Sequence, residues 1–249
     1  NPSHLGGVFS NFIVDGVKEA ELIKGGYNAE YGGRLSAVLN VISREGNRNN
    51  FKGKATLSLL SAQTTLEGPF YKGAWLVSCR RTYFDVLLPK VLPEGTASRI
   101  PPYYFYDIQS HIFSDITPQD RVSISIYNGN DDLIFDTFGL AAKWGNNTVS
   151  THYRRVFSER LIGNFLIANS IFFTEFGLGG SSGIQSKNEI DDITVSGNMT
   201  WFKSPETTVK FGVQHKTLGF QYLNSFQDSI QFEIKTRPAE FAQLSLIHI

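Results

Sequence analysis

Apolar and polar residues alternate with a period of two over several long stretches after residue 50. In residues 121–127, RVSISIY, the valine and isoleucines share one face, while the serines and the tyrosine share the other. Residues 193–201, ITVSGNMTW, and residues 208–216, TVKFGVQHK, repeat this pattern. Because successive side chains of a strand point to opposite sides, the alternation predicts strands with one apolar and one polar face.

The breaks between these stretches alternate in length. Short turns are predicted at 117–120, 157–159 and 203–206, and longer loops at 85–102, 131–138, 177–187 and 221–229. A membrane β-barrel has short turns on one side, longer loops on the other and tilted strands with about 9–11 residues in the hydrocarbon. The pattern favours such an antiparallel barrel, and a soluble β-sandwich, which also alternates, stays open as the alternative. We expect ten strands, at 51–60, 63–68, 74–84, 103–116, 120–131, 139–157, 160–176, 188–203, 206–220 and 230–243.

The first fifty residues differ from the rest. Glycine pairs at 6–7, 25–26 and 32–33 break them into short pieces, and residues 35–43, LSAVLNVIS, form one mostly apolar strand. A polar linker, REGNRNN, follows at 44–50. We therefore expect a domain boundary near residue 50.

Composition narrows the classes of function. Of the 249 residues, 41% are hydrophobic and 13% aromatic, which excludes intrinsic disorder. Lys plus Arg and Asp plus Glu both number 23, so the net charge is zero and gives no electrostatic footprint for nucleic acid. No apolar run reaches the ~18 residues of a transmembrane helix. The chain begins at Asn1, without a starting methionine or a visible signal peptide, so we expect it to be a piece of a longer protein.

Few residues suggest chemistry. The single Cys79 excludes an internal disulfide, and five scattered histidines make a zinc site improbable. The acidic pairs at 131–132 and 191–192 are of a kind that can bind Ca²⁺, although solvated loop charges are the simpler interpretation. No catalytic triad, P-loop or HExxH motif is visible. We expect no catalytic residues, no cofactor and no bound metal, and therefore not an enzyme.

One cluster of residues is more distinctive than the features described so far. Residues 24–36, KGGYNAEYGGRLS, contain two glycine pairs seven residues apart around an aromatic and acidic centre. Glycine is costly in conformational entropy unless the backbone needs tight turns or positive φ angles. Two ordinary turns in a small β domain are the plain alternative to a specialised motif.

Around this cluster the sequence resembles a TonB-dependent outer-membrane receptor. Residues 17–46 resemble the C-terminal end of the plug domain of that family, and residues 66–88 resemble its first barrel strands. The sequence of these segments is similar to that of the family branch common in Bacteroidota. The positions that match the plug motif, in a structural role, are Lys24, Gly25, Gly26, Ala29, Tyr31, Gly32, Gly33 and Arg34.

The resemblance implies a fold that is mainly all-β, a partial transmembrane antiparallel β-barrel preceded by the C-terminal part of a plug domain. Residues 1–50 would belong to the plug, and residues 51–243 would form the N-terminal ten or so strands of a barrel of about 22 strands. Residues 244–249 are expected to be a non-native tail. The polar-face positions expected to line the inner wall of the barrel are Ser123, Thr194, Asn198, Lys210 and Gln214.

The function implied is active uptake of a scarce nutrient, a siderophore, cobalamin, oligosaccharide or peptide, across the outer membrane of a Gram-negative bacterium. The expected partners are TonB, through a TonB box absent from this chain, outer-membrane lipids and an unknown small nutrient ligand, with no nucleic acid. The residues that would bind the substrate are not predicted. The alternative function is a soluble or surface β-rich module that binds a ligand such as a glycan.

Overall fold

The chain is almost entirely β-structure. The computed structural model describes residues 4, 9–10, 12–25, 37–93, 102–135, 139–179, 183–226, 230–236 and 238–248. A short 3-10 turn, Val14–Gly16, precedes the first strand, and one helix, α1 (Phe84–Val91), follows β5. The strands are β1 (Val17–Lys24), β2 (Ala37–Ser43), β3 (Lys52–Leu57), β4 (Ser61–Phe70), β5 (Gly73–Thr82), β6 (Tyr103–Asp115), β7 (Asp120–Phe135), β8 (Leu140–Ser158), β9 (Leu161–Leu178), β10 (Ile184–Ser204), β11 (Thr207–Phe226), β12 (Ile230–Lys235) and β13 (Ala239–His248).

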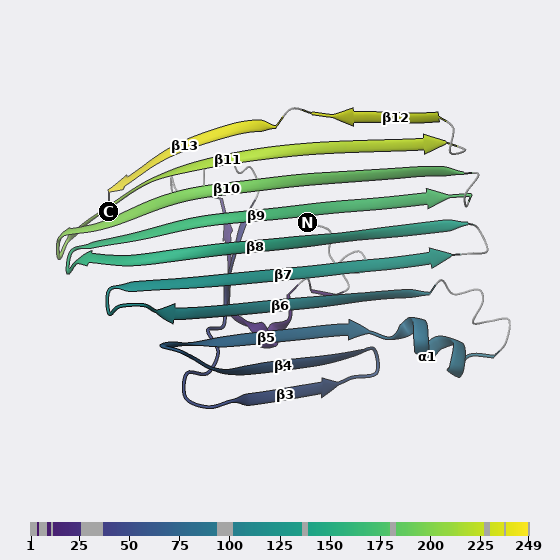
Figure 1. Ribbon diagram of the computed structural model, residues 1–249, viewed down its shortest axis with the longest axis horizontal. Helices are drawn as coiled ribbons and strands as arrows, with labels where there is room; N and C mark the ends of the chain where they lie inside the picture. The colour runs from purple at the N-terminus through teal and green to yellow at the C-terminus, as the bar shows by residue number, and fades with distance from the viewer. Residues whose placement is uncertain are drawn as a thin grey trace.

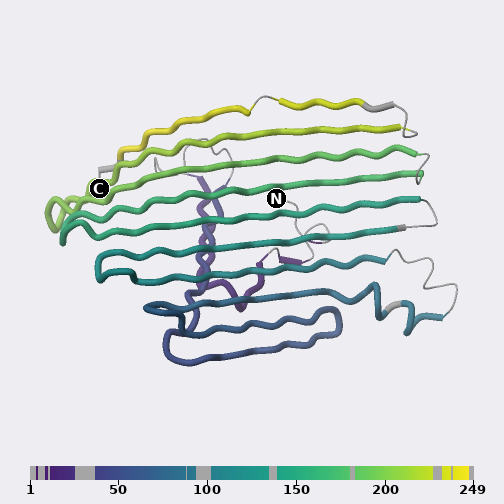
Figure 2. Tube along the Cα trace, in the orientation of Figure 1, coloured from purple at the N-terminus to yellow at the C-terminus, as the bar shows by residue number. Residues whose placement is uncertain are grey.

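The strands form one large antiparallel sheet and one small one. In the large sheet β3 to β12 pair in chain order, each with the next, and β13 returns to pair with β11 beyond the end of β12 (Figure 1). Strands β1 and β2 pair only with each other. This hairpin runs across the direction of the large sheet's strands, on one side of that sheet (Figure 2). The topology is the strand-to-next-strand meander that the alternating pattern predicts.

The ten predicted strands are present with shifted ends, but the predicted loops are wrong in two respects. The segments 131–135, 184–187 and 221–226, expected in loops, continue β7, β10 and β11. Both faces of the strands carry polar residues there, so the alternation fades although the hydrogen-bonded ladder continues. The segment 85–102 was expected to be irregular, yet it contains most of helix α1.

The last predicted strand, 230–243, is also corrected, because it is two strands. The register on β11 shifts by one residue between β12, where Gln221 pairs with Lys235, and β13, where Leu218 pairs with Ala239. Pro238, which has no backbone N–H to donate, lies at this break. Residues 244–248, the expected tail, continue β13 and pair with residues 209–213 of β11. Their non-native origin stays a prediction.

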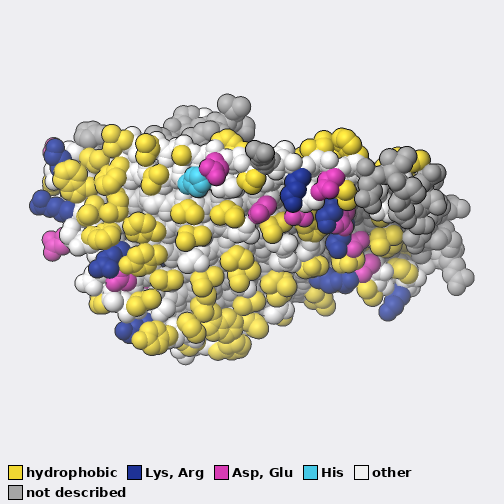
Figure 3. Space-filling view, turned by 45° about the horizontal axis from the view of Figure 1, so that its top comes forward, with side chains coloured by type: hydrophobic (Ala, Val, Ile, Leu, Met, Phe, Trp, Pro, Cys, Tyr) yellow, Lys and Arg dark blue, Asp and Glu magenta, His cyan; other side chains and the backbone are white. Residues whose placement is uncertain are grey.

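The two faces of the large sheet differ sharply. We call the face that residues 4–48 contact the inner face, and the opposite one the outer face. Large apolar side chains of the outer face are 37–60% exposed over much of its length. They are Leu66, Ile108, Ile124, Ile126, Val149, Phe165, Ile167, Ile193, Val195, Trp201, Phe211 and Val213. Hydrophobic side chains cover much of the surface in Figure 3, while charged ones gather toward its ends.

These outer-face residues form rows across the strands. Ile126 of β7 pairs with Val149 of β8, and Ile167 of β9 pairs with Val195 of β10. Along β10 the apolar stretch runs from Ile193 to Trp201, about nine residues, close to the 9–11 that a tilted strand needs to cross hydrocarbon. We call this the apolar band.

The buried core lies on the other side. Ile13, Ala74, Leu76, Tyr103, Phe105 and Phe113 are at most 5% exposed. All but Ile13 belong to β5 and β6, and the N-terminal segments cover them from the inner side. Among the described residues, no helix is long and apolar enough to cross a membrane.

Candidate functional site

The N-terminal segment is fastened to the inner face by a buried histidine. His4 Nδ1 lies 2.7 Å from Asp131 Oδ2 of β7, and His4 Nε2 lies 2.8 Å from Asp107 Oδ1 of β6. The His4 ring stacks on Phe105 with 4.1 Å between ring centroids and 10° between planes. All of these side chains are nearly inaccessible to solvent. We call His4, Asp107, Asp131 and Arg80 the His4 cluster.

Arg80 of β5 completes the cluster. Its Nε donates to Asp107 at 2.8 Å, its Nη2 donates to the same carboxylate and to the Ser10 carbonyl, and its guanidinium lies 4.9 Å from the centre of the Phe105 ring. Tyr127 also donates to Asp107, at 2.9 Å, and Tyr103 donates to Asp131. Every carboxylate oxygen of the cluster therefore has a donor, as buried charges require.

The geometry fixes the charge of His4. A neutral imidazole has one N–H, whereas both ring nitrogens of His4 face carboxylate oxygens, so the ring is doubly protonated. Burial alone would lower the pKa of His4, but the hydrogen bonds and charges of Asp107 and Asp131 outweigh it and raise that pKa to about 9. With Arg80, the cluster holds two cations and two anions and is neutral.

A second anchor lies around Gly16. Arg44 donates to both oxygens of Glu67 on β4, at 3.0 and 3.1 Å, and to the carbonyl of Asp15 at 2.8 Å. The Asp15 carboxylate accepts from Lys54 of β3, at 2.7 Å. Both bonds to Glu67 come from one nitrogen, Nη2, while Nη1 donates to Asp15, so Arg44 links the base of the β1–β2 hairpin to β4.

A third anchor holds the linker at the end of the sheet where the short turns lie. Arg48 reaches Asp115 at 2.7 Å, and Arg121 bonds Asp115 at 2.7 Å and Glu45 at 3.0 Å. Both guanidiniums lie over the Phe113 ring, 4.5 and 4.7 Å from its centre. The linker predicted as a domain boundary is therefore tied to the sheet by ion pairs.

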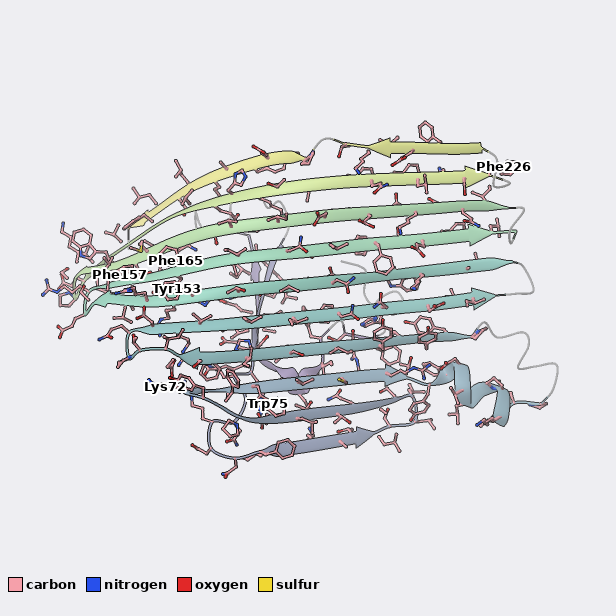
Figure 4. All side chains as sticks on the ribbon, viewed as in Figure 1. Lys72, Trp75, Tyr153, Phe157, Phe165 and Phe226 are labelled. Carbon is pink, nitrogen blue, oxygen red and sulfur yellow. The ribbon has the colours of Figure 1, made fainter. Side chains whose placement is uncertain are left out.

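The strand ends frame the apolar band with polar and aromatic residues. On the outer face, Tyr153, Phe157 and Phe165 lie toward the short-turn end (Figure 4). Tyr153 and Phe165 stack at 5.9 Å, and Tyr153 donates to Asp120 at 2.6 Å. Toward the loops the outer face becomes charged, for example in the Lys187–Glu175 pair at 3.1 Å. Aromatic side chains at the edge of an apolar zone are typical of a membrane interface.

The plug motif lies mostly outside the described residues. Lys24 ends β1 and pairs with Ala37, and Gly25 has a positive φ of 69°, the left-handed conformation that favours glycine. Gly26, Ala29, Tyr31, Gly32, Gly33 and Arg34 are not described. The five predicted inner-wall positions, Ser123, Thr194, Asn198, Lys210 and Gln214, all have the strand parity of the inner face.

The two acidic pairs do not form cation sites. Strand alternation sends Asp131 to the inner face, onto His4, and Asp132 to the outer face, toward Tyr104. Asp191 likewise accepts from Asn169 on the outer face, while Asp192 pairs with Lys216 on the inner face. Within the described ranges, no group of three or more His, Cys, Asp or Glu side chains is arranged to hold a metal ion.

Comparison with known proteins gives a fold likeness. No protein-family model and no curated protein matches the sequence. The ferric preacinetobactin receptor BauA of Acinetobacter baumannii is 10% identical, with a TM-score of 0.57 over 92% of this chain and 41% of the BauA chain. The ferric yersiniabactin uptake receptor FyuA of Yersinia pestis is 11% identical, with a TM-score of 0.45 over 74% of this chain and 34% of its own. This chain thus shares the fold of BauA and spans less than half of its length.

Proposed function

We propose that this chain is part of a TonB-dependent outer-membrane receptor that takes up a scarce nutrient. Residues 1–50 would be the C-terminal part of its plug, and residues 51–243 the first strands of a larger barrel. The observation that carries the proposal is the two-sided sheet, which has an apolar band on its outer face and docked N-terminal segments on its polar inner face. The fold likeness to BauA, a receptor, and the plug motif support the same proposal.

Contact with lipid explains the exposed apolar side chains of the outer face better than contact with a second sheet does. In a soluble β-sandwich the apolar face of one sheet packs on a second sheet. Among the described residues the only second sheet is the β1–β2 hairpin, and it lies on the inner side. The described residues therefore do not include the second sheet with which a soluble glycan-binding module would cover the band.

The contacts of the docked segments suit a plug that must stay attached to the inner face and also be able to leave it. Three anchors consist of ion pairs and hydrogen bonds, which water can replace when the segment leaves the wall. The hairpin between the anchors has mostly exposed side chains. We propose that TonB acts on the plug through a TonB box outside this chain and that outer-membrane lipids surround the band.

The test is to express the complete gene in a Gram-negative host with and without TonB. We expect the protein in the outer-membrane fraction, with heat-modifiable migration on a denaturing gel, and uptake of its nutrient only where TonB is present. A protein recovered in the soluble fraction, or uptake that is equal in the two strains, would overturn the proposal.

A further inference from the structure

The inner face of β8–β12 carries a group of aromatic side chains near the loop end of the sheet. They are Trp144, Phe172, Phe176, Phe220, Tyr222 and Phe232. Cross-strand register places them in adjacent rows: Trp144, Thr174, Asn188 and Tyr222 follow one another across four strands. With a spacing of about 4.8 Å between strands, this row is roughly 14 Å long from β8 to β11. We call this surface the aromatic wall.

The aromatic wall is open, and it continues from the His4 cluster. Phe176, Phe220 and Phe232 are 46%, 37% and 56% exposed. Trp144 pairs in register with Asp131 of the cluster and stacks with Tyr103 at 6.5 Å. The described N-terminal residues thus cover the inner face up to β7 at this height. From β8 onward the rings face the same side without a described segment over them.

Amide and hydroxyl groups are interleaved with the rings. Asn188 donates to Thr174 at 3.2 Å, and Asn224 donates to Tyr222. The Asn224 Oδ1 atom has no hydrogen-bond partner among the described residues. A surface of rings and adaptable amides provides flat apolar contact together with hydrogen bonds.

Charge is absent from this wall. Beyond Asp192 and Lys216, no described inner-face residue of β8–β12 toward the loops is ionisable as an acid or a base other than the phenol of Tyr222. On the outer face at the same height Asp132, Lys143, Glu175 and Lys187 stand in one row. Near the loops, the described residues of these strands therefore carry charged side chains on the outer face and none on the inner face. A strongly charged ligand would find no counter-ion on this wall, and its desolvation would be costly.

We infer that the aromatic wall binds a neutral oligosaccharide, an inference that rests on the proposed receptor function and names its substrate class. Sugar rings have apolar C–H faces that pack on aromatic rings, and their hydroxyl edges exchange hydrogen bonds with amides such as that of Asn188. Phe226 follows Asn224 on the inner face of β11 and lies at the loop end of the sheet (Figure 4). The aromatic wall therefore opens toward the side from which a ligand would arrive.

The test uses the full-length receptor purified in detergent. Malto-, cello-, xylo- and mannohexaose are titrated by calorimetry, beside a hexamer of galacturonate and ferric citrate as charged probes. We expect saturable binding of at least one neutral hexaose, at least tenfold tighter than either charged probe. Tyr222→Ala and Phe220→Ala should each weaken that binding about tenfold, and Tyr222→Phe, which keeps the ring, should weaken it less.

Leu223→Ala, on the outer face of the same strand, is the matched control and should bind as the unaltered receptor does. Heat-modifiable migration shows that each variant is assembled. Absence of neutral binding, tighter binding of a charged probe, or neutral binding that the wall variants leave unchanged would each overturn the inference. So would failure of a hydrophilic maleimide to label Asn188→Cys in a background where Cys79 is replaced by serine, because a plug segment would then cover the aromatic wall. Outer-membrane location and TonB dependence, measured in parallel, would show whether the receptor proposal survives such a result.

Discussion

Replacement of His4 by glutamine should release the N-terminal segment from the inner face. Glutamine can still form hydrogen bonds, but it carries no charge, so Arg80 alone would face the buried carboxylates of Asp107 and Asp131. Removing one partner of a buried ion pair typically costs ~3–5 kcal/mol. The difference between a pKa of 6.5 in the undocked segment and about 9 in the docked one gives a similar magnitude, on the order of 3 kcal/mol.

The same pKa values give the pH dependence of docking. Because docking raises the pKa of His4, protonation stabilises the docked state. The contribution is complete below pH ~6.5, and it falls as the pH rises, until it is lost above about 9. The charged or titratable groups facing His4 are Asp107, Asp131 and Arg80, with the phenols of Tyr103 and Tyr127 bonded to the two carboxylates. The cluster should therefore hold firmly at neutral pH and weaken in mildly alkaline solution.

Pulse-labelled hydrogen exchange of the full-length protein can measure this local equilibrium. The Phe9 amide, which donates to the His4 carbonyl at 3.3 Å, and the Arg44 amide, which donates to Gly16, report on docking. Exchange rates are divided by the intrinsic rate at each pH. We expect about 100-fold less protection of Phe9 in His4→Gln at pH 6.5 and a much smaller difference at pH 9.5. The control is His152→Gln, at another inner-face histidine that has no carboxylate partner among the described residues. Equal protection in His4→Gln and the unaltered protein, or a loss that is complete by pH 7, would refute the reasoning.

Two further changes test the sheet and the linker. Ile124→Arg, on the outer face, should lower assembly into the outer membrane by ~2–4 kcal/mol if it lies near the midplane, whereas Ser123→Arg, on the inner face, should be tolerated; equal effects, measured by heat-modifiable migration, would contradict the membrane assignment. Gly46→Ala should destabilise the linker strongly, because φ is +88° and the new Cβ would lie 2.5 Å from the Trp75 carbonyl oxygen. Gly25→Ala, where φ is +69° but no atom of the described residues lies within 4 Å, should lose only the backbone contribution of about 1–2 kcal/mol, as thermal unfolding can check.

The strands were predictable where one face is apolar and the other polar. Within the apolar band the period of two is clear, so β6 to β11 emerge from the sequence with the correct partners. Toward the loops both faces mix polar and apolar residues, and the strand ends there were mistaken for loops. Helix α1 was missed because its short sequence, FDVLLPKV, contains Pro89 and offers about two turns of pattern.

The His4 cluster could not be predicted from the sequence. His4 is separated from Asp107 by 103 residues and from Asp131 by 127, and no local motif connects them. Asp131 instead looked like one of two adjacent loop charges. The only available signal was that two basic residues, Arg80 and Arg81, occur inside a strand otherwise suited to a half-buried position. Which of them faces inward depends on strand parity, and only the register of β5 with β6 decides it.

The distribution of charge on the inner face separates the docked N-terminal segments from the surface proposed to bind a ligand. On β4–β7 the inner-face acids Glu67, Asp107, Asp115 and Asp131 each meet a cation from the N-terminal segments or the linker. Those pairs confine the docked segments to one part of the wall. From β8 onward the loop end of the same face offers rings and amides but no charge, so a docked segment gains no ion pair by extending there. The uncharged part thereby stays open for the proposed neutral ligand, which needs no charged partner. The Phe220→Ala and Tyr222→Ala variants should therefore leave the hydrogen-exchange protection of the Phe9 amide unchanged.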